Sequence, residues 1–156
     1  MKFGISSLLA ALLLSCSAGA FAQQAGAKPE QQIKWRQSVY QVLGWNSGRI
    51  KANVDGQYNK DEVVRAANAI AALANSGIGS LFGPGTETGK GWKETATKPE
   101  FFKNPQKVGE LAGNFNREAN ELAKVAATGD AAAVKAQFGN LGKACKACHD
   151  DFKAKD

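Results

Sequence analysis

The spacing of apolar residues from residue 28 onward predicts helix for most of the chain and gives few strand signals. Pro29 and Glu30 are typical of a helix start, and inward positions then recur at intervals of three and four, the period of one helix face. Gly44 and Gly48 leave the end of this first helix undefined. Its inner stripe consists of Ile33, Arg36, Tyr40, Leu43, Ser47 and Ile50.

A second helix is expected to begin after Asn59, whose side chain can cap it. Asp61 and Glu62 fall in its first turn, where their negative charges interact favourably with the positive end of the helix dipole. Residues 75–77, with the sequence NSG, are expected to end it. Its inner stripe consists of Val63, Ala66, Ile70 and Leu73.

Two further helices carry heptad seams. The third is expected to begin at Pro99 or Pro105 and to end before Gly129, and Asp130 is placed to cap the fourth. Apolar positions in both alternate between steps of four and three. The third seam consists of Val108, Ala112, Phe115, Ala119, Leu122 and Ala126. The fourth consists of Val134, Phe138, Leu141, Cys145, Cys148 and Phe152.

Residues 77–98 are rich in glycine and show no period, so they form one long connection between the second and third helices. Phe82 and Trp92 are expected to fold this connection down onto the domain. Four amphipathic helices with one long central connection predict an all-α fold, an antiparallel up-down-up-down four-helix bundle.

The first 22 residues have the pattern of a secretory signal peptide. Lys2 precedes an apolar run, and small residues lead to a cleavage site after Ala22. The apolar run is too short to span a membrane, and no later segment approaches the roughly 20 apolar residues that a span requires. A lipoprotein signal acylated at Cys16 is the alternative, although Leu14 suits its lipobox poorly. We expect an exported protein whose single domain is residues 23–156.

Loss of the signal peptide would leave very few metal ligands. The remaining cysteines are Cys145 and Cys148, the one histidine is His149, and Met1, the one methionine, is lost. The formal charge falls from +6 to +5 with the loss of Lys2. The lysines are dispersed and form no basic run with interleaved aromatics, so nucleic acid is not expected as a partner.

The sequence CKACHD at residues 145–150 is compatible with zinc binding, with dithiol redox chemistry or with a haem. A structural zinc site needs about four ligands, and His149 points about 100° away from Cys148 on a helix. Dithiol centres use a helix N-terminus to lower the thiol pKa, whereas this pair lies near a helix C-terminus. Cysteines at i and i+3 share a helix face and can form two thioethers to one porphyrin. We therefore predict one covalent haem c in the bundle core, attached by Cys145 and Cys148 and ligated by His149.

The same count of ligands predicts an open axial position. Low-spin electron carriers commonly take a second axial His or Met, and the mature chain would have neither. Unless a lysine, a tyrosine or the N-terminal amine binds, the iron is five-coordinate. Its distal face can then take a small diatomic gas.

Three side chains near the start of the first helix are candidates for the haem surroundings. Tyr40 is expected at the distal wall, where it packs, gates access or hydrogen-bonds a ligand; ordinary core packing is the alternative. Arg36, a charge on the inward stripe, is expected to contact the haem propionates together with Gln37. A solvent-facing side chain is the alternative for Arg36, and Lys90 is a further candidate for the propionates.

Taken together, these features resemble the cytochromes c′, the high-spin branch of the class II cytochromes c. The resemblance rests on CKACHD, on KPEQQIKWRQS at residues 28–38 and on LFGPGTE at residues 81–87, and it covers nearly all of the chain after residue 22. It implies Phe82 packed against the macrocycle, NO and CO as ligands, homodimers through the first two helices, and a periplasmic role. Two positions depart from the family pattern. Tyr40 stands where leucine or phenylalanine is common, and Lys153 stands where an arginine often flanks a proximal NO site.

Two functions stay open on the sequence alone. The first is a gas-binding haem protein, concerned with NO, in which the open axial position is the functional site. The second is an electron-transfer module that docks an acidic periplasmic redox partner through its lysines. An enzyme is not expected, because the chain offers no distal histidine or acid/base pair that could shuttle protons.

Overall fold

The computed structural model describes residues 26–155 of the chain. The expected signal peptide of residues 1–22 and the alternative at Cys16 lie outside these residues. Within the described range the only β-pairing is two isolated bridges, and all longer elements are helices. No helix in this part of the chain is both long enough and apolar enough to cross a bilayer.

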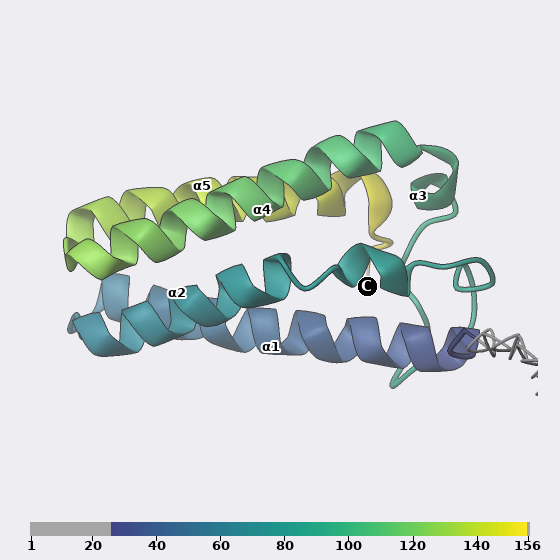
Figure 1. The fold of residues 1–156 in the computed structure, drawn as a ribbon, viewed down its shortest axis with the longest axis horizontal. Helices are drawn as coiled ribbons and strands as arrows, with labels where there is room; N and C mark the ends of the chain where they lie inside the picture. Colours follow the sequence, from purple (N-terminus) through teal and green to yellow (C-terminus); the bar gives the residue numbers. More distant parts are fainter. Residues whose placement is uncertain (1–25, 156) are drawn as a thin grey trace, which may run out of the picture.

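Four long helices are arranged in two layers (Figure 1). α1 (Pro29–Asp55) and α2 (Lys60–Ala74) form one layer, and α4 (Pro105–Thr128) and α5 (Ala131–Phe152) form the other. Each of α1 and α4 packs against both α2 and α5. Consecutive long helices run in opposite directions, which confirms the predicted up-down-up-down four-helix bundle.

The helix ends follow signals that the sequence carries. The Asn59 side chain accepts a hydrogen bond from the backbone N–H of Glu62 at 3.1 Å and so caps α2. Asp130 caps α5 by accepting from the N–H groups two and three residues later, at 2.9 and 3.0 Å. Gly129 ends α4 with a φ of 83°, a left-handed conformation that favours glycine.

Two helix boundaries are sharper than the sequence pattern predicted. α1 continues through Gly44 and Gly48, because Leu43 and Ile50 on either side of them are buried and tertiary packing outweighs the weak helix propensity of glycine. Both predicted starts of the third helix are used, since Pro99 precedes the short helix α3 (Glu100–Lys103) and Pro105 begins α4. A single turn of 3-10 helix, η1 (Ile78–Leu81), follows α2.

The buried core lies toward the end of the bundle opposite the long connection. It is built largely from alanine, valine, isoleucine and leucine. Its members are Leu43, Ile50, Val63, Ala66, Ala67, Ile70, Ala74, Ala119, Leu122, Ala126, Val134 and Leu141. Small alanines at the contact allow the helices to approach closely.

The other end of the bundle is organised differently. The predicted α4 seam continues to Val108 and Ala112, but Val108 is half-buried and Ala112 is exposed, so the seam does not form a buried core there. Figure 1 shows the α4 ribbon moving away from α2 toward this end, where α3 and the long connection lie. This end of the molecule holds the candidate site.

Candidate functional site

A pocket of about 330 Å³ lies between α1, the connection, α3 and the end of α5. Its volume falls in the usual range for small-molecule and cofactor sites. Six of the predicted site residues line it: Arg36, Gln37, Tyr40, Phe82, Cys148 and His149. The seventh, Cys145, lies one helical turn before Cys148 and packs against the buried core.

Cys145 and Cys148 are free, half-buried thiols on the last turns of α5. Burial raises the pKa of both, with the charge of Cys148 adding to the effect at Cys145 and that of Asp151 adding to it at Cys148. A redox dithiol needs a lowered thiol pKa, so this environment does not favour that chemistry. No group of three or more His, Cys, Asp or Glu side chains in residues 26–155 is arranged to hold a metal ion.

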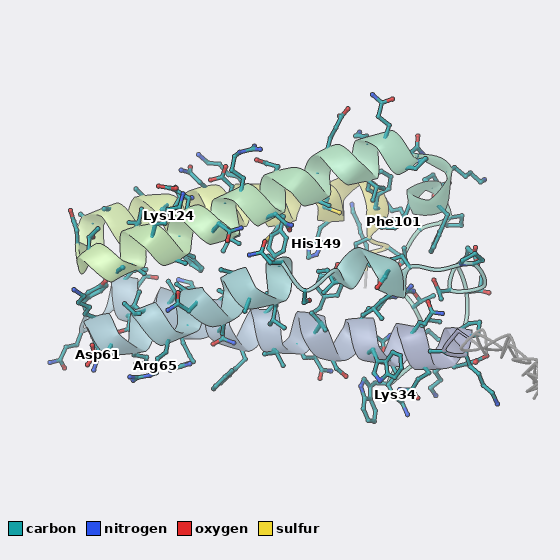
Figure 2. All side chains as sticks on the ribbon, in the orientation of Figure 1. Lys34, Asp61, Arg65, Phe101, Lys124 and His149 are labelled. Carbon is teal, nitrogen blue, oxygen red and sulfur yellow. The ribbon has the colours of Figure 1, made fainter. Side chains whose placement is uncertain are left out.

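His149 lies at the pocket with its side chain in the space between the two layers (Figure 2). Partial desolvation and, next, the charge of Lys153 lower the pKa of the imidazole, while Asp150 acts in the opposite direction. A lowered pKa favours the neutral imidazole, which is the form that ligates metals.

Arg36 is a buried charge, with only 3% of its surface exposed. Its two terminal nitrogens donate to the Leu81 carbonyl (3.3 Å), the Thr86 hydroxyl (2.9 Å) and carbonyl (2.8 Å), and the Thr95 hydroxyl (2.6 Å). The guanidinium carbon also lies 4.6 Å from the centre of the Phe82 ring. Arg36 therefore ties α1 to three points of the connection.

The Arg36 guanidinium has no carboxylate within 4.0 Å among the described residues, as its four acceptors are all neutral. Burial lowers its pKa, while Tyr40 and Glu87 act to raise it, and arginine stays charged in proteins. Buried charges are normally paired, so the site suits an anionic group close to Arg36. The predicted propionate contact stays a prediction.

Gln37 is bonded to the backbone of the connection. Its Oε1 accepts from the N–H groups of Trp92 (2.7 Å) and Lys93 (3.4 Å), and its Nε2 donates to the Lys93 carbonyl (2.8 Å). These bonds use both the oxygen and the nitrogen of the side-chain amide, so the position of Gln37 is explained without any contact to a cofactor.

Tyr40 faces the pocket with 45% of its surface exposed. Desolvation of the phenol raises its pKa to about 12, the charge of Cys148 adds to the shift, and Arg36 opposes it. The hydroxyl is therefore neutral around pH 7 and able to donate a hydrogen bond.

Aromatic rings form the apolar wall near α3. Phe82 stacks on Phe101 with ring centres 4.4 Å apart, and Phe101 meets Phe152 edge-on at 5.6 Å. Phe82 thus folds onto the domain as predicted. Trp92 also folds onto α1, although its side chain is 59% exposed. Its Nε1–H donates to the Ser38 hydroxyl at 2.8 Å, and the Lys34 ammonium lies 4.4 Å from its ring centre.

The connection is also bonded to the end of α5. The backbone N–H of Lys98 donates to the Phe152 carbonyl at 2.9 Å, and that of Ala154 donates to the Ala96 carbonyl at 2.8 Å. Together with Arg36 on the opposite side, these bonds hold residues 93–97 between α1 and α5, where they line the pocket.

Three residues of the site were missed by the sequence analysis: Thr86, Thr95 and Phe101. The two threonines lie in a segment without a period, so nothing in the sequence signals that they accept hydrogen bonds from Arg36. Phe101 lies directly after Pro99 and Glu100 in α3, and the apolar pair at positions 101 and 102 is the signal that could have found it.

The profile of the family described as Cytochrome C′ matches residues 31–153, which includes the whole pocket. The chain belongs to the cytochrome c′ family. It is 70% identical over 131 residues to the cytochrome c′ of Rhodocyclus tenuis, a match that covers 83% of this chain and 98% of the relative. Cytochromes c′ bind haem c, so this is a haem c protein.

Solved cytochromes c′ share the fold. One, reported with an unusual ligand-controlled dimer dissociation, is 55% identical and superposes with a TM-score of 0.81 over 84% of this chain and 100% of its own. A ferrous variant of the cytochrome c′ of Alcaligenes xylosoxidans with bound NO is 31% identical and gives a TM-score of 0.74, covering 83% of this chain and 98% of its own. Another variant of that protein was solved with carbon monoxide bound.

The pocket residues fit a covalent haem c. The thiols of Cys145 and Cys148 are free and share one face of α5, and His149 follows them at the pocket. Aromatic rings supply an apolar wall, and Arg36 supplies a buried positive charge suited to a propionate.

Proposed function

We propose that Cys145 and Cys148 would hold haem c as thioethers, that His149 would be the one protein side chain to ligate its iron, and that the iron would bind NO or CO. The observation that carries this proposal is the donor set: in residues 26–155, His149 is the only histidine and there is no methionine. When bound, the haem would supply an iron that can bind a small diatomic ligand.

The surrounding residues have separate tasks in this proposal. Tyr40 forms the distal wall as a neutral phenol, and Phe82 packs against the ring. Arg36 and Gln37 lie on the propionate side, and the buried charge of Arg36 supports its assignment most directly. Because none of these residues is placed to act as an acid/base pair, we assign ligand binding and no enzymatic turnover to the site.

Electronic spectra of the ferrous protein, with and without CO and NO, test the proposal. We expect a five-coordinate spectrum that changes on adding either gas, and a protein mass equal to the polypeptide plus one haem. A low-spin spectrum that does not change when CO or NO is added would contradict the proposal. Absence of covalent haem would contradict the roles of Cys145 and Cys148.

We further propose that the protein acts in the periplasm, because c-type haem is attached outside the bacterial cytoplasm and the chain begins with the pattern of a signal peptide. Recovery of the haem protein from a periplasmic extract, with an N-terminus at residue 23, would support this. A protein that keeps residues 1–22 would contradict export, and one that starts at an acylated Cys16 would contradict cleavage after Ala22.

Electron transfer is the second candidate function, since Lys93 and Lys153 line the pocket and can attract an acidic redox partner. This candidate predicts electron exchange that slows as salt is added. Exchange that is absent with every acidic periplasmic reductase, or independent of salt, would remove it.

A homodimer through α1 and α2 is part of the proposal. Trp35, Val42 and Trp45 on α1 are 46%, 44% and 63% exposed, which is unusual for large apolar side chains and favours a protein partner. We expect wild-type protein to sediment as a dimer and Trp45→Glu as a monomer with an unchanged haem spectrum. A monomeric wild type at high concentration would contradict the dimer.

A further inference from the structure

Residues 89–95 of the connection form a small closed loop, which we call the clasp. The backbone N–H of Thr95 donates to the Gly89 carbonyl at 2.9 Å and closes it. Residues 93–95 line the pocket on one side. The clasp is therefore part of the pocket wall, although it contributes nothing to the buried core of the bundle.

The clasp is attached to α1 through its backbone. Gln37 makes three hydrogen bonds to it, accepting from the N–H groups of Trp92 and Lys93 and donating to the Lys93 carbonyl. Gly91 lies so close to the helix that a Cβ on it would be 2.7 Å from the backbone nitrogen of Lys34. Only glycine allows this approach.

We propose that Gln37 is a positioning residue that latches the clasp to α1, and that the latched clasp limits the size of the molecules that enter the pocket. Arg36 holds one end of the clasp at Thr95, and the Trp92 Nε1–H donates to the Ser38 hydroxyl on α1 at 2.8 Å. Loss of Gln37 therefore frees the backbone at Trp92 and Lys93 while these two side-chain contacts remain. The inference rests on the proposed ligand binding, and it gives Gln37 a task that does not require contact with the haem.

Two variants release the clasp from opposite sides. Gln37→Leu removes the three hydrogen bonds, and Gly91→Ala forces the backbone away from α1. In both variants we expect the rate of trypsin cleavage after Lys90 and Lys93 to rise about tenfold. Cleavage follows the population of the open form, and the loss of ordinary hydrogen bonds raises that population by about this factor. Gly79→Ala is the matched control, since a Cβ there meets no atom within 4 Å.

Ligand entry provides the second readout. Tert-butyl isocyanide and CO bind the same ferrous iron but differ in size. In both release variants we expect the association rate of the isocyanide to rise about tenfold, in line with the open population, and that of CO to rise much less. Gly79→Ala should leave both rates unchanged.

The outcomes separate the possibilities. Faster cleavage with unchanged isocyanide rates contradicts the size limit, and unchanged cleavage contradicts the latch. An effect of Gln37→Leu that Gly91→Ala fails to reproduce shows that Gln37 acts on the haem itself, which also overturns the inference. A wild-type protein that binds no CO contradicts the proposed function, while trypsin cleavage still tests the latch.

Discussion

Tyr40 is a neutral phenol at the pocket, and its protonation is set by its surroundings. Desolvation is the first cause of its raised pKa, and the charges of Cys148 and Cys145 add to it. The charge of Arg36 opposes them and is outweighed. The pKa of Tyr40 therefore lies above its ordinary value of 10.0 in the folded chain.

If Tyr40 blocks the distal face, its truncation should open that face. We expect Tyr40→Ala to bind CO faster and more tightly than wild type, measured by stopped-flow mixing of the ferrous protein. Tyr40→Phe keeps the ring and should keep the slow rate, so it separates bulk from the hydroxyl. Equal rates in all three proteins would assign Tyr40 to packing alone.

The raised pKa of Tyr40 also predicts a dependence of stability on pH. The folded protein holds this proton up to a pKa of about 12, whereas the ordinary pKa is 10.0. The contribution to folding is thus complete below pH 10 and is lost as pH rises from there through about 12. Urea unfolding of wild type and Tyr40→Phe across this range should show the advantage of wild type declining. A constant difference would contradict the shift.

Single residues also show what sequence alone can predict. Cys145, Cys148 and His149 were predicted because their spacing has a chemical meaning that needs no fold. Thr86 and Thr95 were not, since their role as acceptors for Arg36 depends on how a segment without a period folds back onto α1. Covalent chemistry can be predicted from local spacing in the sequence, whereas the partners of long-range hydrogen bonds are known only from the folded chain.

At the scale of elements, the four long helices were predictable and the path of the connection was not. Apolar periods and capping residues such as Asn59 and Asp130 depend on neighbours in sequence, and they placed the helices well. The connection has few apolar residues and is positioned mainly by polar contacts from α1 and α5. Arg36 makes four of these hydrogen bonds, to Leu81, Thr86 and Thr95.

Removing Arg36 should therefore loosen an element and leave the bundle intact. We expect Arg36→Met to lower the free energy of unfolding by about 3 kcal/mol, because buried acceptors lose charge-assisted hydrogen bonds. Arg36→Lys should recover little, since an ammonium lacks the planar fork that meets several acceptors. Urea unfolding measures both.

The exposed Arg65 on α2 offers a matched control for Arg36. We expect Arg65→Met to change the free energy of unfolding by less than about 0.5 kcal/mol, as is usual for surface positions. If the two Arg→Met variants were equally stable, the hydrogen bonds of Arg36 would contribute nothing net.

The whole molecule has two ends that are stabilised differently. The end with the α1–α2 and α4–α5 turns is packed by the buried apolar core. The end with the connection surrounds the pocket, and there the predicted seam of α4 is half-buried or exposed. Haem attached at Cys145 and Cys148 would supply apolar contacts at this second end.

Loss of the haem should then affect the two ends unequally. In a Cys145→Ser/Cys148→Ser protein we expect backbone amides in residues 105–115 and 143–152 to exchange with solvent much faster than in the haem protein. Amides in residues 63–74 and 119–126 should stay protected, because they belong to the buried core. Hydrogen exchange measured by mass spectrometry checks this, and equal acceleration at both ends would contradict it.

The alanine-rich core has a consequence for protein engineering. Ala66, Ala67, Ala74, Ala119 and Ala126 are all at most 4% exposed, and none of them lines the pocket. A designer can therefore rebuild the clasp, the distal wall or the aromatic wall without repacking the part that keeps the helices together. By the same division, we expect the bundle to accept other porphyrins whose two vinyl groups can react with the thiols of Cys145 and Cys148.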